Sequence, residues 1–169
     1  MRNDQVVTCQ PLPPWLVKTT TSVAGLQQAI EHTCEGRGFT IRCLDGQRMT
    51  TLDGVFEEFS KSLGFPDYYG RNSAALEECL IDLSWLSAPG YVLVITNSAS
   101  LLASEPESEL TWLLTLLERV CEEWSRPVSL GEEWDRPAVP FHVVFQGEPN
   151  EKTALPPQIN SLPGLTINE

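Results

Sequence analysis

A chain of 169 residues with 41% apolar side chains is large enough for one domain with a hydrophobic core. Its net charge of −12, from 23 acidic and 11 basic residues, disfavours nucleic-acid binding through a basic surface. The acidity indicates either solubility alone or a basic protein partner attracted by the negative field. No apolar run approaches the ~20 residues of a membrane span, and the first residues lack an apolar leader core, so a cytoplasmic location is expected.

The cysteines predict neither disulfides nor a metal site. There are five of them, no Cys-x-x-Cys pair occurs, and only two histidines accompany them. Three lie within apolar patterns, where a free thiol packs as a small apolar group. We interpret the cysteines as reduced and structural, and we predict no metal ion and no cofactor.

The N-terminal part predicts an arm, a strand and a helix. Residues 1–14 are polar and rich in proline, which indicates a flexible arm, and a short strand is predicted at 15–18. Ser22 is a candidate N-cap for a helix that Gly36 and Gly38 end. Apolar residues at helical spacing give this helix one apolar face.

A second strand and a second helix follow. Residues 39–44 are rich in β-formers and run into Asp45-Gly46, a turn signal. Gly64 and Pro66 end the helix that comes next. The apolar residues of this helix fall on one face: Leu52, Val55, Phe56, Phe59 and Leu63.

The C-terminal half predicts two more strands around a long helix. Residues 91–96 form a continuous apolar run, which is typical of a strand covered on both faces. Ser104 and Glu107 have capping-box spacing, with Pro106 in the first turn of an amphipathic helix. The last strand is predicted at 141–145.

The element order is therefore β-α-β-α-α-β-α-β. Strands separated by helical crossovers are usually parallel, so we predict an α/β fold with a small parallel sheet of three to four strands and helices packed on it. We expect one domain over residues 15–146. Residues 147–169 are rich in proline and predict a tail that is either flexible or laid on the surface.

Trp134 lies in a long loop. The sequence around it, EEWDRP at 132–137, nearly repeats EEWSRP at 122–127. Trp134 either offers an exposed aromatic contact or covers the edge of the core. We favour the second interpretation, because long loops are often held by one aromatic side chain.

No sequence motif indicates catalysis. The chain has no G-x-S-x-G elbow, P-loop or G-x-G-x-x-G motif, and His142 lies inside a strand pattern typical of a structural histidine. An enzyme that uses Glu77, Glu78 and His142 remains as the alternative, and it requires a closed pocket that joins the three residues. We predict that the chain is not an enzyme.

Residues 65–72 combine aromatic, polar and glycine residues just before a predicted helix at 73–84. Tyr68 and Tyr69 would give a large, stiff contact area of the kind favoured at interfaces. Gly70 predicts a backbone conformation that is closed to other residues. Either Asn72 or Ser73 can cap the helix.

The helix at 73–84 has an acidic side. Glu77 and Glu78 diverge by about 100° around the axis and do not face each other. Glu78 and Asp82 are four residues apart and share a face, and together with Ala74 and Ile81 they form a ridge opposite the core stripe. The ridge is either a solvated polar face or a docking site for a basic protein.

The stretch LGFPDYYGRNSAALEECLIDL at 63–83 resembles the central motif of the barstar family, L-x-F/L-P-x-Y-Y/F-G-x-N-W/L-D-A-L-x-D-C-L. Barstar-like proteins are small α/β inhibitors of ribonucleases, and the resemblance extends over residues 39–146. It implies that the loop and the start of the following helix block a ribonuclease active site, with carboxylates in place of substrate phosphate. The resemblance matches Tyr68, Gly70 and Asn72 to contact residues of the family loop and Glu78 to its principal acidic helix residue. Asp82, one turn further on, is an extra candidate. The predicted partner contacts on this loop and helix are therefore Tyr68, Tyr69, Gly70, Asn72, Ala74, Glu77, Glu78 and Asp82.

This chain departs from the family motif at several positions. Ser73 stands where the family has Trp or Leu, Ala74 where it has Asp, and Glu78 where it has the shorter Asp. Arg71 adds a cation to a loop that would mimic phosphate. We therefore weigh two hypotheses: an inhibitor or immunity protein directed at a basic ribonuclease toxin, and an interaction module of the same fold without inhibitory activity.

Overall fold

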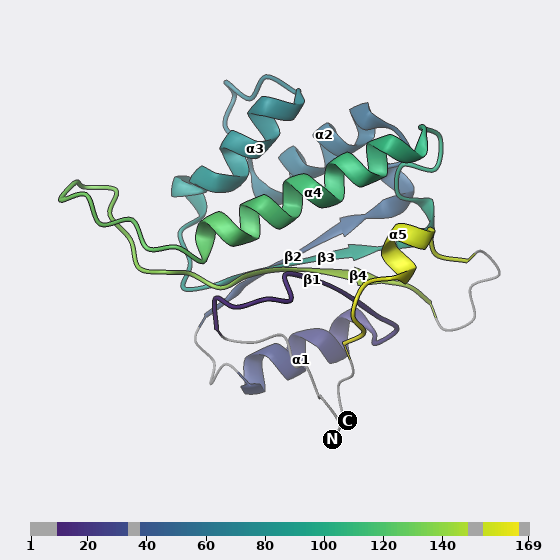
Figure 1. The fold of residues 1–169 in the computed structure, drawn as a ribbon, viewed down its shortest axis with the longest axis horizontal. Coiled ribbons are helices and arrows are strands. Elements are labelled where there is room, and N and C mark those ends of the chain that lie inside the picture. The colour runs from purple at the N-terminus through teal and green to yellow at the C-terminus, as the bar shows by residue number, and fades with distance from the viewer. Residues whose placement is uncertain (1–9, 34–37, 149–153, 166–169) are drawn as a thin grey trace.

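The computed structural model describes residues 10–33, 38–148 and 154–165, which form a parallel sheet with helices on both faces (Figure 1). The strands are β1 (Leu16–Thr19), β2 (Thr40–Asp45), β3 (Tyr91–Thr96) and β4 (Phe141–Gln146). The helices are α1 (Val23–Thr33), α2 (Leu52–Leu63), α3 (Ser73–Asp82), α4 (Glu107–Trp124) and the short α5 (Pro157–Asn160). The predicted α/β class is confirmed.

The sheet has four strands in the order β1-β4-β3-β2, and all neighbouring strands are parallel. Val94 of β3 lies opposite Cys43 of β2 on one side and Val144 of β4 on the other, which places β3 inside the sheet. Parallel strands need crossover connections, and helices α1 to α4 supply them. The predicted sheet of three to four parallel strands is therefore confirmed.

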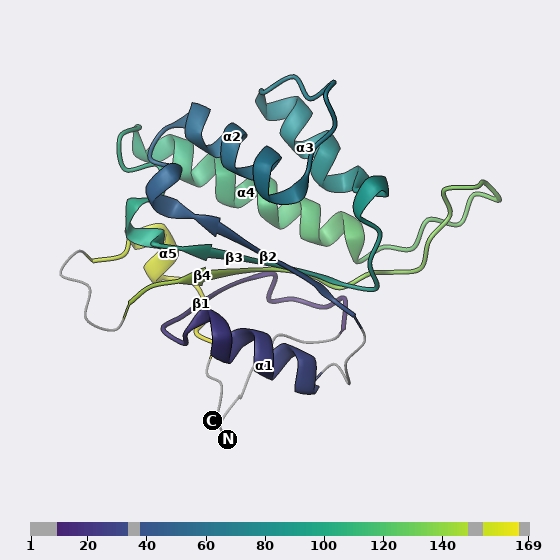
Figure 2. The same cartoon turned by 180° about the vertical axis from the view of Figure 1, so that it is seen from behind.

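Helices α2, α3 and α4 cover one face of the sheet, and α1 covers the other (Figures 1 and 2). Successive side chains of a strand point to opposite faces. Accordingly Leu93 and Ile95 of β3 belong to the larger core, while Val92 and Val94 belong to a smaller core with Leu26 of α1. This arrangement explains the continuous apolar run of β3.

Helix ends follow local signals in some places and tertiary contacts in others. Ser22 caps α1, because its hydroxyl accepts a hydrogen bond from Gly25 N at 3.2 Å. The predicted end of α3 near residue 84 is wrong, because Leu83 takes a left-handed conformation with φ 44° and ends the helix at Asp82. The predicted end of α1 at Gly36 lies outside the described residues.

The predicted capping box at the start of α4 is also wrong. Pro106 is the N-cap residue of α4, and no side chain caps this helix. The carboxylate of the neighbouring Glu105 instead accepts a hydrogen bond from Leu52 N at 3.2 Å, at the start of α2. Glu105 therefore supports the start of α2, not the start of α4.

The C-terminal segment lies along the free side of β1. Lys18 N donates to Pro163 O at 2.9 Å, and Leu165 N donates to Lys18 O at 2.7 Å. Ile159 of α5 is buried in the larger core and Leu165 in the smaller one. The described part of the predicted tail therefore contributes to both cores.

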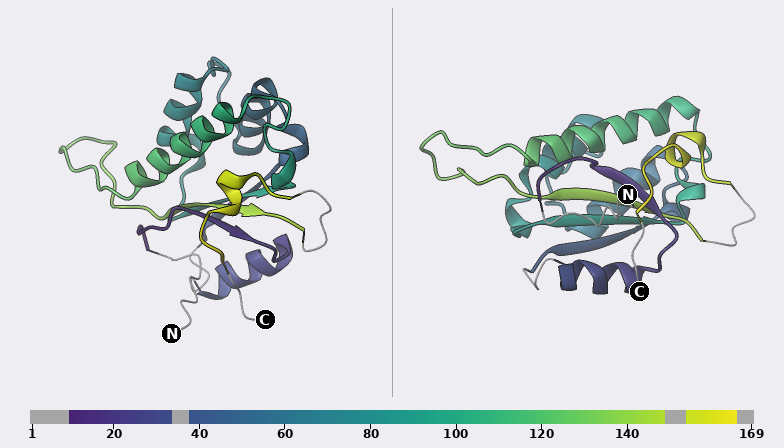
Figure 3. Two further views of the ribbon diagram at one scale, coloured as in Figure 1. Left: turned by 45° about the vertical axis from the view of Figure 1, so that its right-hand side comes forward. Right: turned by 60° about the horizontal axis from the view of Figure 1, so that its bottom comes forward.

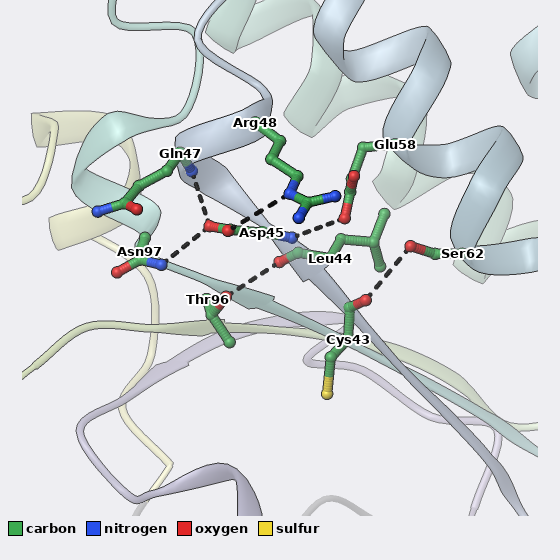
Figure 4. A network of polar contacts seen from close by, with 9 residues as sticks. All are labelled: Cys43, Leu44, Asp45, Gln47, Arg48, Glu58, Ser62, Thr96 and Asn97. Carbon is green, nitrogen blue, oxygen red and sulfur yellow. Dashed lines mark hydrogen bonds and ion pairs between the residues drawn. The ribbon is translucent and has the colours of Figure 1, made fainter.

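A network of polar contacts fixes the carboxyl end of β2 (Figure 4). The Asp45 carboxylate accepts hydrogen bonds from Gln47 N and Asn97 Nδ2, both at 2.9 Å, and lies 3.9 Å from Arg48. Asp45 N donates to the buried carboxylate of Glu58 at 3.2 Å. These two acids support the fold, because their oxygens bind backbone and side-chain groups at or just after the ends of β2 and β3.

Between α4 and β4, residues 125–140 leave the body of the molecule as a narrow hairpin, which we call the ribbon (Figure 3). Trp134 lies on the ribbon and is 65% exposed. The favoured interpretation, that Trp134 covers the edge of the core, is therefore wrong. Trp124, at the end of α4, is the buried tryptophan in this region.

Candidate partner-binding site

The corner at residues 65–72 is attached to the core through one aromatic residue. Phe65 is buried, and the rings of Tyr69 and Trp85 pack edge-on against it with centroid distances of 4.8 and 6.0 Å. Trp85 also donates a hydrogen bond to Leu63 O at 2.9 Å. These contacts tie the loop to the end of α2 and to the turn after α3.

The two adjacent tyrosines have different roles in this structure. Tyr68 is 74% exposed, whereas Tyr69 is half-buried against Phe65. The Tyr69 hydroxyl is buried and has no hydrogen-bond partner among the described residues, and burial raises its pKa to about 12. Tyr68 is therefore available for contact, while Tyr69 holds the loop.

The remaining loop residues prepare the start of α3. The prediction for Gly70 is wrong, because the left-handed residue is Arg71, with φ 51°. A side chain at position 70 would instead crowd Asn72, whose Nδ2 lies 3.1 Å from where a Cβ would stand. Asn72 is the N-cap: its Oδ1 accepts a hydrogen bond from Ala75 N at 2.9 Å.

Arg71 is turned toward α2 and forms an ion pair. Its guanidinium lies 2.6 Å from the Glu57 carboxylate, and both side chains remain largely exposed. The pair neutralises the one cation of the motif loop. The positive charge that the sequence places in this loop is therefore balanced locally.

Helix α3 presents three different sides. Leu76, Cys79 and Leu80 are buried, as predicted for the core stripe. Glu77 points to α4, where its carboxylate lies 3.0 Å from Arg119. The residues on the outer side are exposed: Ala74, Glu78 and Asp82.

Glu78 and Asp82 carry charges that the described part of the chain does not pair. Tyr68 lies within electrostatic range of them: partial desolvation, followed by the coulombic effects of Asp82, the Cys79 thiol and Glu78, raises the pKa of its hydroxyl. The structure thus brings Tyr68, Glu78 and Asp82 together on one exposed surface. We call these three residues the acidic corner.

Ser73 contacts a residue that sequence patterns did not select. Its Oγ accepts a hydrogen bond from Trp112 Nε1 of α4 at 2.9 Å. Trp112 packs edge-on against Phe56 of α2, with ring centroids 6.2 Å apart. A tryptophan from another helix therefore lies beside the position where the barstar motif has a large side chain of its own. Trp112, Arg119 and Glu57 were missed because each acts across a tertiary contact.

The residues of the enzymatic alternative do not form one site. Glu77 binds Arg119 on α4, whereas His142 is buried in β4 with its ring nitrogens 3.2 Å from the carbonyl oxygens of Pro14 and Gln10. Burial lowers the pKa of His142 and outweighs the two carbonyl contacts, which raise it. Among the described residues, no group of three or more His, Cys, Asp or Glu side chains could hold a metal ion, and no helix has the length and apolarity of a membrane span.

Comparison with known proteins identifies the family. The family described as Barstar (barnase inhibitor) matches residues 39–146, more than half of the chain and all of β2, β3 and β4. The chain belongs to the barstar family. The resemblance stated from the motif is therefore confirmed, over the same residues.

One curated relative gives a second line of similarity. The chain is 37% identical over 54 residues to a Bacillus subtilis (strain 168) protein described as "Putative ribonuclease inhibitor YrdF". The matched stretch covers 32% of this chain and 56% of that protein, so the chain matches little more than half of the relative's length. Both comparisons associate the chain with inhibitors of ribonucleases.

Proposed function

We propose that this protein binds a basic ribonuclease and blocks its active site with carboxylates in place of substrate phosphate. The observation that carries the proposal is the acidic corner. Two carboxylates on α3 have no ion pair in the described part of the chain, and an exposed tyrosine lies on the loop before that helix. The chain that carries them belongs to the barstar family.

The geometry suits recognition of a cationic surface. Glu78 and Asp82 lie one helical turn apart, so their carboxylates face the same direction and can bind neighbouring Arg or Lys side chains. Tyr68 adds a large apolar contact area with few rotatable bonds beside them. A ribonuclease holds substrate phosphates with cationic groups, and carboxylates placed against those groups exclude the substrate.

The departures from the family motif concentrate the charge on two residues. Ala74 supplies no carboxylate, and Glu77 shares its charge with Arg119. Arg71 does not oppose the acids, because it pairs with Glu57. Glu78 and Asp82 therefore provide the phosphate mimicry, while the other predicted contacts shape the surface: Tyr69, Gly70, Asn72, Ala74 and Glu77.

The biological setting that follows is a cytoplasmic immunity protein that neutralises a ribonuclease toxin. It acts by occupying the toxin and has no catalytic activity of its own. The second hypothesis is a binding module of the same fold without inhibitory activity, and Ala74 favours it because one family carboxylate is missing there.

An inhibition and binding assay tests the proposal. The enzymes to use are barnase and any ribonuclease-domain protein encoded beside this gene. We expect a stable complex with at least one of them, loss of its RNA-cleaving activity, and slower association at higher ionic strength. Glu78→Ala and Tyr68→Ala should each weaken binding by about 2 kcal/mol, roughly 30-fold.

Glu31→Ala serves as the control, because Glu31 is exposed on α1, on the opposite face of the sheet. It should leave inhibition unchanged. If Glu78→Ala and Tyr68→Ala also leave binding intact, the site is wrongly assigned. A tight complex that leaves the ribonuclease fully active would favour the second hypothesis.

A further inference from the structure

The ribbon at residues 125–140 is closed by specific hydrogen bonds at its tip. Val128 and Arg136 exchange two backbone hydrogen bonds of 2.9 and 3.0 Å. The Asp135 carboxylate accepts from Leu130 N at 2.9 Å and from Gly131 N at 2.7 Å, and these bonds lower its pKa. These hydrogen bonds give the tip one defined turn conformation, in which Gly131 has a positive φ of 80°.

The base of the ribbon is held by one arginine. The Arg136 guanidinium lies over the Trp124 ring, 4.2 Å from its centroid, and donates to Arg126 O at 3.0 Å and Trp124 O at 3.3 Å. Val139 N also donates to Trp124 O at 2.8 Å. The cation is thus committed to the ribbon itself, and the ribbon leaves the body in a defined direction.

Beside the ribbon lies a groove of about 730 Å³, which the end of α3, the following turn and the end of α4 close on the other side. Its apolar lining includes Ile81, Trp124 and Val139. Its charged lining consists of three carboxylates and one cation, Arg136, which already stacks on Trp124; the carboxylates are Asp82, Glu123 and Glu133. The groove therefore combines an apolar floor with an acidic rim.

The ribbon also carries exposed apolar side chains. Leu130 is 71% exposed and Trp134 is 65% exposed. Among the described residues, the large apolar side chains with the greatest exposure are Tyr68, Leu130, Trp134 and Leu12, and the first three belong to the acidic corner or the ribbon. Exposed aromatic groups on a preorganised support are typical of interface contacts.

We infer that the groove and the ribbon form a second docking region, which receives a cationic and apolar segment of the same basic partner. The inference rests on the proposed function for the identity of that partner. Asp82 belongs to both the acidic corner and the groove lining, so one partner can cover both without a gap. The acidic rim complements Lys and Arg side chains, and Trp134 with the floor complements apolar ones.

The negative charge of the groove disfavours a second copy of this chain, nucleic acid and anionic lipid as its ligands. A second copy of this chain would bring another net charge of −12 to an acidic groove. Nucleic acid and anionic lipid would meet the same repulsion. A basic protein segment has the complementary charge.

A titration with a short peptide tests the groove independently of any ribonuclease. The probe is the hexapeptide Lys-Arg-Leu-Leu-Lys-Arg, blocked at both ends, added to the ¹⁵N-labelled full-length chain. We expect saturable, salt-sensitive chemical-shift changes at the Trp134 indole and at Val128 and Val139. Trp134→Ala should weaken peptide binding by about tenfold, and Glu133→Gln by two- to threefold.

Matched controls separate this inference from the proposed function. Leu130→Ala should weaken peptide binding, whereas Leu12→Ala and Glu31→Gln should not. Tyr68→Ala should leave peptide binding unchanged, although it weakens binding to the ribonuclease. Shift changes confined to Tyr68 and Glu78, or no saturable change at millimolar peptide, would overturn the docking region. Failure to inhibit any ribonuclease, with peptide binding intact, would overturn the proposed function and leave the groove as a docking region for a cationic segment of another protein.

Discussion

Two pairs of acidic residues in this molecule are used in opposite ways. Asp45 and Glu58 accept hydrogen bonds from backbone and side-chain groups at the carboxyl end of β2 (Figure 4). Glu78 and Asp82 lie exposed on α3 and pair with no described residue. The first pair is part of the fold, and the second is available to a partner.

The comparison shows why net charge alone does not locate a binding site. The chain carries 23 acidic residues, and several of them are balanced by hydrogen bonds or cations. Glu77 and Glu57 are exposed or half-exposed like the acids of the corner, yet each lies within 3.0 Å of an arginine. Glu78 and Asp82 differ from Glu57 and Glu77 because their oxygens keep free hydrogen-bonding capacity toward a partner.

Asp45→Ala should have the largest effect and should act on stability. It leaves Gln47 N and Asn97 Nδ2 without their acceptor, which costs about 2 kcal/mol of unfolding free energy. Urea denaturation followed by circular dichroism measures the loss. Glu78→Ala is the control and should change the unfolding free energy by less than about 0.5 kcal/mol. Equal losses in both variants would remove the distinction between the two pairs.

Asp82→Asn should show the reverse behaviour. The substitution keeps the shape of the side chain but removes its charge, so binding to the ribonuclease should weaken by about tenfold, or 1.4 kcal/mol. The unfolding free energy should stay the same, because no described residue pairs with Asp82. Calorimetric titration gives the affinity, and a stability loss without an affinity loss would place Asp82 with the structural acids.

Arg119→Ala should convert a paired acid into a free one. Removal of the guanidinium 3.0 Å from Glu77 adds one uncompensated charge to α3. Association with a basic ribonuclease should then be about two- to threefold faster at low salt, an effect that vanishes at high ionic strength. Stopped-flow fluorescence measures the rate, and the double variant Arg119→Ala/Glu77→Gln should cancel the gain.

The Tyr68 hydroxyl should report the charges of the acidic corner. Negative neighbours disfavour the phenolate, so Glu78→Gln and Asp82→Asn should each lower the pKa of Tyr68 toward its ordinary value. Glu77→Gln is the control and should leave it unchanged. Carbon-13 chemical shifts of labelled tyrosine follow the titration. No shift in either acidic variant would mean that these carboxylates do not face Tyr68.

Periodicity and local capping signals predicted most of the fold. The single apolar face from Leu52 to Leu63 gives the bounds of α2, and the apolar run at 91–96 gives β3. Asn72 was one of two expected caps for α3 and is the one used. These features depend on neighbours in the sequence, which is why the pattern contains them.

The errors arise where distant residues decide the local structure. Glu105 binds Leu52 N, and the capping box predicted at Ser104 does not form. Trp134 was expected on the core, but Trp124 and Arg136 occupy the base of the ribbon and leave Trp134 exposed. No pattern in the neighbouring sequence predicts these contacts.

The acidic corner was predictable in part for the same reason. The motif and helical spacing selected Tyr68, Glu78 and Asp82, because exposure on a helix face follows from the period. The pairing of Glu77 with Arg119 joins residues on two helices and has no sequence signal. Sequence therefore identified the surface, and the structure identified which of its charges are free.

The layer formed by β1 and α1 precedes the residues that match the barstar family. A chain truncated before Phe39 would keep every family residue and still expose Val92, Val94 and Val144, which pack against Leu26 and Ile30 of α1. It would also leave β4 as an open edge strand, a template for pairing with other chains. The part of the chain that matches the family is thus smaller than the part that folds as one body, and an expression fragment cut to the family boundary should aggregate.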